Sequence, residues 1–180
     1  MKVGLDVDGV LANFYLEFCR LCDKPYDVLY NWDTPWINDH FHKVIDDEEF
    51  WKRLPVVSPP ESINFDFHYY ITSVPPGMEE ARAEWLNNHG FPDKPVIGTD
   101  KKVEVMQDLG VDILIDDKYD TLIAVEEAGM LPIQFIPKFL YPEGEVPTTV
   151  KHLSEVKGII EDYRELNTLT KENALIVNGS

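Results

Sequence analysis

The sequence predicts an α/β protein built on one parallel sheet. Short apolar runs recur along the 180 residues, and each is bounded by polar or turn-forming residues. Helical segments of about ten residues separate these runs, which is the alternation that a parallel sheet with helices on both faces requires. The composition, 44% hydrophobic and 12% aromatic, is that of a folded domain. A chain of this length can bury one core and carry a small insertion.

The first apolar run begins at residue 2 and ends in the motif Asp6-Val7-Asp8-Gly9. Alternate residues of a strand point to the same side, so Asp6 and Asp8 are predicted to converge where this strand leaves the sheet. Paired carboxylates there suit a divalent cation and phosphoryl chemistry. A solvated turn is the alternative. A calcium loop is excluded because Val10 and Leu11 stand where that loop needs an acid or amide and a glycine.

A helical region follows the first strand. Residues 11–23 have apolar side chains at helical spacing. Residues 24–60 are rich in Pro, Trp and Asp, with short helices expected at 35–42 and 46–54. The sequence therefore predicts a small helical cap at 14–60, inserted after the first strand. Its tryptophans are expected mainly in the core of the cap rather than against a ligand: Trp32, Trp36 and Trp51.

Strands and helices then alternate along the rest of the chain. Four strands are expected, at residues 67–73, 95–98, 112–115 and 132–136. Helices are expected at residues 76–89, 101–109, 121–128 and 150–166. Together these elements predict a Rossmann-like sheet of about five strands, with its core in residues 1–13 and 61–167. Residues 168–180 have weak periodicity and are expected to form a flexible tail.

The charge of the chain restricts its partners. The formal net charge is −17, from 33 acidic against 16 basic residues. Such a surface repels nucleic acid polymers and anionic membranes, but a cation and a few lysines could still admit a small anionic substrate. No apolar run is long enough for a membrane span, and a strand starting at residue 2 leaves no room for a signal peptide.

The two cysteines form a Cys19-x-x-Cys22 motif inside a predicted helix. Reduced thiols packed in that helix are the favoured interpretation, ahead of a zinc site completed by His40 and His42 and ahead of a redox motif. Reduced cysteines without a leader predict a cytoplasmic protein. The oligomeric state is left open by the sequence, and a homodimer is allowed.

Polar residues end three of the predicted strands. Ligands bind beyond the carboxyl ends of the strands in an open parallel sheet, so these residues are expected to share one edge. Beside Asp6 and Asp8, the sequence places Thr72 with Ser73, and Asp116 with Asp117, at such ends. A lysine pair, Lys101-Lys102, begins the helix before the fourth strand. Each fragment alone is typical of a turn or a helix end. Their common edge indicates a catalytic site.

The motifs Asp6-Val7-Asp8-Gly9, Ile71-Thr72-Ser73, Lys102 and Ile115-Asp116-Asp117 resemble, in this order, those of the haloacid dehalogenase (HAD) superfamily of aspartyl-phosphate phosphatases. The resemblance spans residues 2 to 140, and the insertion after the first motif resembles a C1-type cap. More closely, the chain is similar to the 5'(3')-deoxyribonucleotidase family. That similarity rests on Asp-Gly-Val-Leu-Ala, Phe14, Ile-Thr-Ser-Val-Pro and Leu-Ile-Asp-Asp-Lys.

The resemblance implies catalytic and metal-binding roles. Asp6 would be the nucleophile that forms an aspartyl-phosphate, and Asp8 would be the general acid and base. Mg²⁺ would be held by the Asp6 carboxylate, the Asp8 backbone carbonyl and the second acidic pair. Within that pair Asp117 is favoured as the ligand, with Asp116 assisting.

It also implies how the substrate is held. Thr72 or Ser73 would donate a hydrogen bond to a phosphate oxygen. Lys102 would neutralise charge on the phosphoryl group, and it is preferred over Lys101 because its spacing to Asp116 suits one helix and one strand. Phe14 would contact the nucleoside.

The function implied is that of a Mg²⁺-dependent hydrolase, a phosphatase of small phosphorylated metabolites, most similar to a nucleotidase of deoxynucleoside monophosphates. Three alternatives stay open. The substrate could be a sugar phosphate or another metabolite, the phosphoryl group could pass to an acceptor other than water, or the fold could serve a non-catalytic nucleotide-binding regulator.

Overall fold

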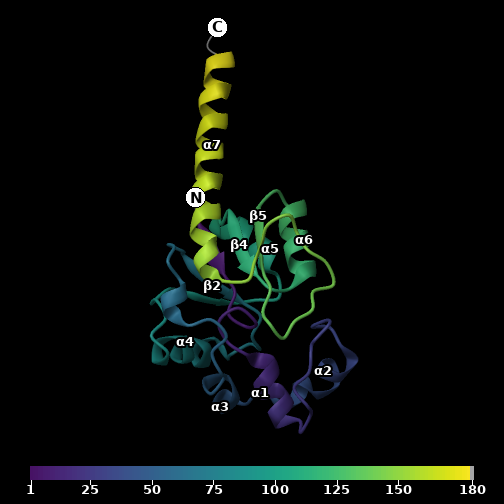
Figure 1. Ribbon diagram of the computed structural model, residues 1–180. Helices are drawn as coiled ribbons and strands as arrows, with labels where there is room; N and C mark the ends of the chain where they lie inside the picture. Colours follow the sequence, from purple (N-terminus) through teal and green to yellow (C-terminus); the bar gives the residue numbers. More distant parts are fainter. Residues whose placement is uncertain (179–180) are drawn as a thin grey trace.

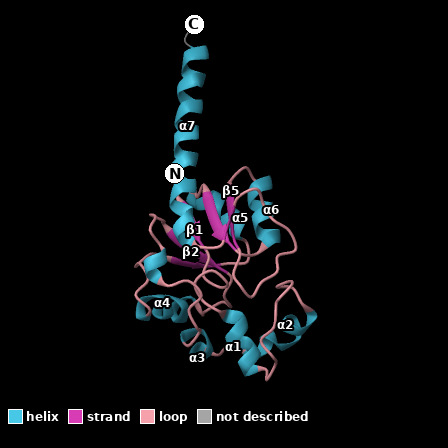
Figure 2. Ribbon diagram, in the orientation of Figure 1, coloured by secondary structure: helices cyan, strands magenta, loops and turns pink. Residues whose placement is uncertain are grey.

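The computed structural model describes residues 1–178, with side chains through residue 170. Its centre is a six-stranded sheet in the order β3-β2-β1-β4-β5-β6 (Figures 1 and 2). Every neighbouring pair of strands is parallel, which confirms the predicted α/β fold class. The strands are β1 (Val3–Leu5), β2 (Tyr69–Thr72), β3 (Val96–Gly98), β4 (Ile113–Asp116), β5 (Leu131–Phe135) and β6 (Thr149–Val150).

The sheet has one strand more than the predicted five, and the additional strand is β6. β6 has only two residues, too few to show any alternation in the sequence. It pairs with the end of β5, where Gln134 lies opposite Thr149. The buried Gln134 side chain also accepts from the Val146 backbone and donates to the Gly144 carbonyl, at 3.0 Å each. A contact between distant segments therefore creates this strand.

The helices occur where the sequence predicts them, with shifted ends. They are α1 (Phe14–Leu21), α2 (Pro35–His40), α3 (Glu48–Lys52), α4 (Glu79–Asn88), α5 (Lys102–Leu109), α6 (Tyr119–Glu127) and α7 (Val156–Asn178). The predicted start of the first helix at residue 11 is wrong. Residues 9–12 form a turn in which the Gly9 N–H donates to the Ala12 carbonyl at 2.8 Å. Asn13 then caps α1 by accepting from the Leu16 N–H.

Helices cover both faces of the sheet. Met106 of α5 and Val125 of α6 pack with Leu114 in one buried cluster. Ile113 and Ile115 point to the opposite face, where the larger core includes α4 and the first turns of α7. β4 is therefore buried on both sides, as a central strand of a parallel sheet must be.

The helical segment between β1 and β2 lies at the end of the molecule opposite α7 (Figure 1). It contains α1, α2 and α3, and aromatic side chains fill it. Phe14 stacks on Phe18 and on Trp51, with ring centroids 5.1 and 5.6 Å apart. Cys19 is buried in α1, and neither it nor Cys22 is in a disulfide. The boundaries predicted for a cap at 14–60 stay a prediction.

The last helix is longer than predicted. α7 continues through Asn178, and Figure 1 shows its far half extending away from the rest of the protein. Leu166 and Leu169 on this part are 63% and 56% exposed. The predicted flexibility of residues 168–180 stays a prediction, and residues 179–180 lie outside the described part. Within residues 1–178, no helix combines the length and apolar character needed to cross a membrane.

Candidate active site

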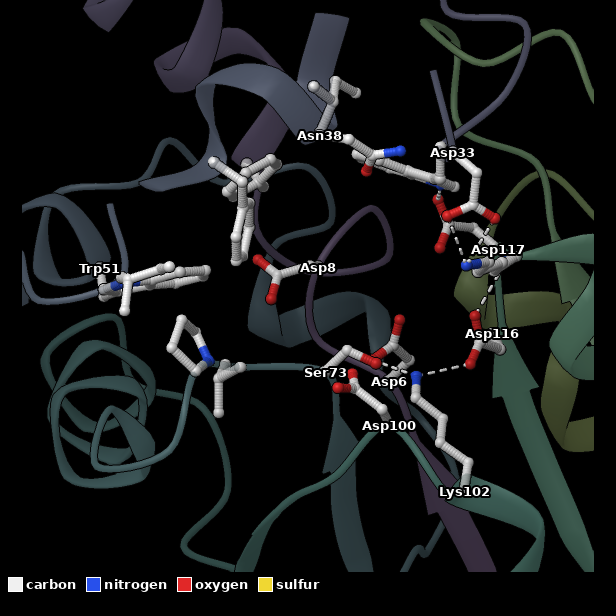
Figure 3. A pocket seen from close by; sticks show the side chains of 18 of the residues that line it. Asp6, Asp8, Asp33, Asn38, Trp51, Ser73, Asp100, Lys102, Asp116 and Asp117 are labelled. Atoms are coloured by element: carbon white, nitrogen blue, oxygen red, sulfur yellow. Dashed lines mark hydrogen bonds and ion pairs between the residues drawn. The ribbon is translucent and has the colours of Figure 1, made fainter. Parts of the chain in front are cut away.

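The sheet topology brings two acidic strand ends together. The strand order reverses between β1 and β4, and in such sheets the crevice beyond this switch point is the usual ligand site. Asp6 directly follows β1, Asp116 ends β4 and Asp117 comes next. One carboxylate oxygen from each lies within 4.8 Å of the others, and all three residues are buried (Figure 3).

A single buried lysine faces this carboxylate cluster. Lys102 Nζ lies 2.9 Å from Asp6 Oδ1 and 2.7 Å from Asp116 Oδ2, and its side chain is 5% exposed. Lys101 is 74% exposed and pairs with Glu104 on its own helix. The structure therefore brings Lys102, not Lys101, to the cluster.

The cluster contains more acidic than basic groups. Burial, together with the neighbouring Asp116 carboxylate, raises the pKa of Asp6 to about 7. Burial and the same neighbour also raise the pKa of Asp117 well above its usual range. For Lys102, burial disfavours the charged ammonium, but the Asp116 and Asp6 carboxylates outweigh it and raise the lysine pKa. Asp6 Oδ1 forms an ion pair with Lys102 but has no hydrogen bond among the residues that the structure describes, so one buried oxygen still lacks a directed partner.

Asp117 lies between the glycine turn and the helical segment that connects β1 to β2. Its Oδ2 accepts a hydrogen bond from Trp32 Nε1 at 2.9 Å. Next to these two residues, Lys118 Nζ lies 3.0 Å from Asp33 Oδ2. On the other side, Gly9 has φ +83°, and a Cβ there would lie 2.0 Å from Asp117 Oδ2. Both the backbone conformation and the close approach therefore require glycine at position 9.

Asp8 has different partners from Asp6. Its Oδ1 and Oδ2 lie 2.6 and 2.8 Å from Arg82 Nη2, and Thr72 Oγ1 donates to Oδ2 at 3.4 Å. β1 ends at Leu5, so the strand alternation expected to aim both carboxylates at one point does not extend to Asp8. Burial raises the pKa of Asp8, while the guanidinium of Arg82 opposes the rise.

Asp6 and Asp8 line the same cavity, which has a volume of about 420 Å³. Its polar floor includes the carboxylate cluster, Asp8 and Lys102, as Figure 3 shows. Ser73 lines the cavity, although its hydroxyl donates to the Thr99 carbonyl at 3.3 Å. Thr72 is fully buried and is not among the lining residues.

Aromatic side chains from the segment after β1 form a wall of the cavity. The wall residues are Phe14, Trp32, Phe41 and Trp51. Phe14 is 5% exposed, so it belongs both to the aromatic core and to the cavity wall. Trp36 packs away from the cavity against Phe18 and Lys24. The expectation that the tryptophans serve mainly the core fits Trp36 and also Trp51, which is 1% exposed, although Trp51 and Trp32 are among the residues that line the cavity.

Sequence reasoning misses Arg82. This residue is in α4, on the face that the apolar pattern assigns to the interior, between Ala81 and Trp85. It has no exposed surface. A charged residue at an inner position of a helix is unusual without a partner, and that conflict was the available signal. The identity of the partner, Asp8, depends on a contact across 74 residues of sequence.

The pKa of Asp6 predicts how stability depends on pH without divalent cations. The unfolded side chain titrates near 3.8, whereas the folded one titrates at about 7. Between these values the folded state holds a proton that the unfolded state has lost, so stability falls as pH rises. The contribution of Asp6 to the free energy of unfolding in EDTA should therefore fall from pH 4 to 7, by an amount on the order of a few kcal/mol. Urea titrations of the wild type and Asp6→Asn isolate this contribution, and an equal slope in both proteins would contradict it.

Comparison with known proteins finds a distant similarity. No known protein-family model matches the chain. The chain is 24% identical over 101 residues to a protein from Halalkalibacterium halodurans described as a "putative nucleotidase". The alignment covers 52% of this chain and 50% of the relative, so the chain spans about half the length of the curated relative it matches. The buried aspartate cluster on a parallel sheet is consistent with a HAD-like fold.

Proposed function

We propose that the protein is a Mg²⁺-dependent phosphatase of the HAD type, which hydrolyses small phosphomonoesters through an aspartyl-phosphate. One observation carries the proposal: Lys102 bridges Asp6 and Asp116 beside Asp117, at the switch point of the sheet and inside a cavity. Phosphoryl transfer depends on positioning and on neutralising charge, and this arrangement offers a carboxylate nucleophile with a cation beside it.

The donor set fits a hard divalent cation. Three buried carboxylates face one ammonium, and magnesium prefers oxygen ligands. Asp6, Asp117 and the Asp8 carbonyl would hold the ion. Asp117 is preferred to Asp116 because both Asp116 oxygens are engaged, by Lys102 at 2.7 Å and by the Lys118 N–H at 2.8 Å. When bound, Mg²⁺ would neutralise charge on the phosphoryl oxygens and help to orient the phosphoryl group toward Asp6.

The residues of the chain would carry the two chemical steps. An Asp6 oxygen attacks phosphorus while the bond to the ester oxygen breaks, and Asp8 donates its proton to that leaving oxygen. Water then attacks the aspartyl-phosphate and gives a proton back to Asp8. Inorganic phosphate leaves, and the Asp6 carboxylate is restored. Lys102 neutralises charge on the phosphoryl group throughout.

The cavity also supports a division of labour between the two hydroxyl residues. Ser73 lines the cavity and is the better donor to a phosphate oxygen. Thr72 is directed instead toward Asp8. Beside the charged floor, Phe14, Trp32 and Trp51 line the cavity and would suit a flat, apolar group such as a nucleobase. With the name of the distant relative, this wall favours a deoxynucleoside monophosphate as substrate, as in a 5'(3')-deoxyribonucleotidase.

A panel of monophosphates with Mg²⁺ tests both the proposed phosphatase activity and the proposed nucleotide substrate. We expect deoxynucleoside monophosphates to exceed sugar phosphates in kcat/KM by at least about tenfold, since only they fill the aromatic wall. EDTA should reduce turnover to background, and added Mg²⁺ should restore it. Equal or faster turnover of sugar phosphates would redirect the proposal to a metabolite phosphatase. Binding of nucleotides without release of phosphate would favour a regulatory protein instead.

A further inference from the structure

Arg82 is a buried cation beside the cavity rather than in it. Its side chain has no exposed surface, and its guanidinium lies 5.1 Å from the ring centre of Trp51 and 5.7 Å from that of Trp85. Burying a charge is unfavourable unless the charge is paired. The position of Arg82 therefore requires a specific partner.

The two rings beside Arg82 are themselves fixed. Trp51 Nε1 donates to the Val44 carbonyl and Trp85 Nε1 donates to the Leu54 carbonyl, at 2.8 Å each. α3 supplies one ring and α4 the other, so the slot for the guanidinium spans the segment after β1 and the α/β core. A guanidinium between two anchored rings has little freedom to move.

Within the described part of the chain, the hydrogen bonds of the Arg82 guanidinium all go to the carboxylate of Asp8. Nη2 contacts both oxygens of Asp8, at 2.6 and 2.8 Å. Nε and Nη1 have no hydrogen-bond partner among the described residues, although they are buried. An arginine placed only for stability would be expected to satisfy more of its five donors. Its use of a single nitrogen ties Arg82 to Asp8 alone rather than to the surrounding backbone.

We propose that Arg82 is a positioning residue that holds the Asp8 carboxylate for proton transfer to and from the ester oxygen. The inference rests on the proposed phosphatase function. The buried Arg82 and Thr72 side chains both contact the Asp8 carboxylate. These contacts keep the Asp8 carboxylate apart from the cluster around Asp6. Without Arg82, the Asp8 side chain would lose its ion pair and with it a fixed place at the cavity.

Two substrates separate this role from a purely structural one. A deoxynucleoside monophosphate releases an alkoxide, which needs a proton from Asp8 as the bond breaks. p-Nitrophenyl phosphate releases a stabilised phenolate that needs little protonation. Loss of a positioned acid therefore slows the first substrate more than the second, whereas a loosened fold slows both alike.

The variants are R82M, which keeps the volume, R82K, which keeps the charge, and the control R53M. Arg53 pairs with Glu17 away from the cavity. With Mg²⁺, we expect R82M to lower kcat on the nucleotide about 100-fold and on p-nitrophenyl phosphate less than about tenfold, with KM little changed. R82K should recover part of the loss, and R53M should match the wild type. If R82M does not fold, as judged by circular dichroism, R82K carries the same comparison.

The Asp8→Asn variant completes the experiment. It should show the same preference between substrates, and adding R82M to it should cost less than about threefold more, because both changes remove one function. Equal losses on the two substrates, or no loss, would overturn the role of Arg82 while leaving the proposed function intact. A wild type that hydrolyses neither ester would overturn the proposed function and this inference with it.

Discussion

Replacing Asp6 with Asn is expected to reduce phosphatase activity by at least about 10³-fold while the fold is retained. The amide has nearly the shape of the carboxylate but cannot attack phosphorus. Lys102 keeps its 2.7 Å contact with Asp116, so the variant does not leave the lysine without a partner. Steady-state hydrolysis with Mg²⁺, together with circular dichroism, measures the two halves of the expectation.

Trapping experiments make this test specific for the nucleophile. Rapid acid quenching of wild-type protein with labelled substrate should leave phosphate bound covalently to the peptide that contains Asp6, and the variant should carry none. Asp66→Asn is a matched control, because Asp66 is an exposed acid that pairs with Lys94 away from the site. Retention of more than about a tenth of the activity by Asp6→Asn would rule out the aspartyl-phosphate mechanism.

The second large effect is expected from Lys102→Met. Removing the ammonium leaves Asp6, Asp116 and Asp117 facing one another without a compensating charge from Lys102. Breaking a buried ion pair in this way costs about 3–5 kcal/mol, so the variant should lose stability in EDTA at pH 8. Activity with Mg²⁺ should fall by at least about 10²-fold, because charge on the phosphoryl group is no longer neutralised.

Lys101→Met is the matched control for this variant. Lys101 is the preceding residue but is 74% exposed and contacts only Glu104 among the ion pairs of the described residues. Its replacement should change activity by less than about twofold. Urea unfolding and steady-state kinetics of both variants provide the comparison. A larger effect at Lys101 than at Lys102 would reassign the lysine of the site.

The sequence predicts the sheet well because its signals are local. Each strand and the helix after it are short, contiguous patterns, and an acid at a strand end follows the strand wherever the topology places it. The rule that ligands bind beyond the carboxyl ends of the strands is then enough to bring Asp6 and Asp116 together. Lys102 could be preferred to Lys101 because its spacing to Asp116 suits one helix and one strand.

Other features depend on contacts that local patterns do not contain. β6 exists only because β5 offers it an edge. Arg82 is placed near the site by its contact with Asp8, and Trp32 by its hydrogen bond to Asp117. Each contact joins segments that are distant in the sequence. The helix start at Phe14 instead of residue 11 depends on a turn closed by Gly9 and Ala12, which the apolar spacing of the segment conceals.

The contact between Gly9 and Asp117 has a consequence for how such a site can change over time. Any side chain at position 9 would have to displace the Asp117 carboxylate, which lies beyond another strand more than a hundred residues later. A side chain at position 9 is therefore excluded twice, by the positive φ of the turn after β1 and by the acid after β4. Although the two motifs are separate in the sequence, a side chain at position 9 could not be accepted unless the Asp117 carboxylate also moved.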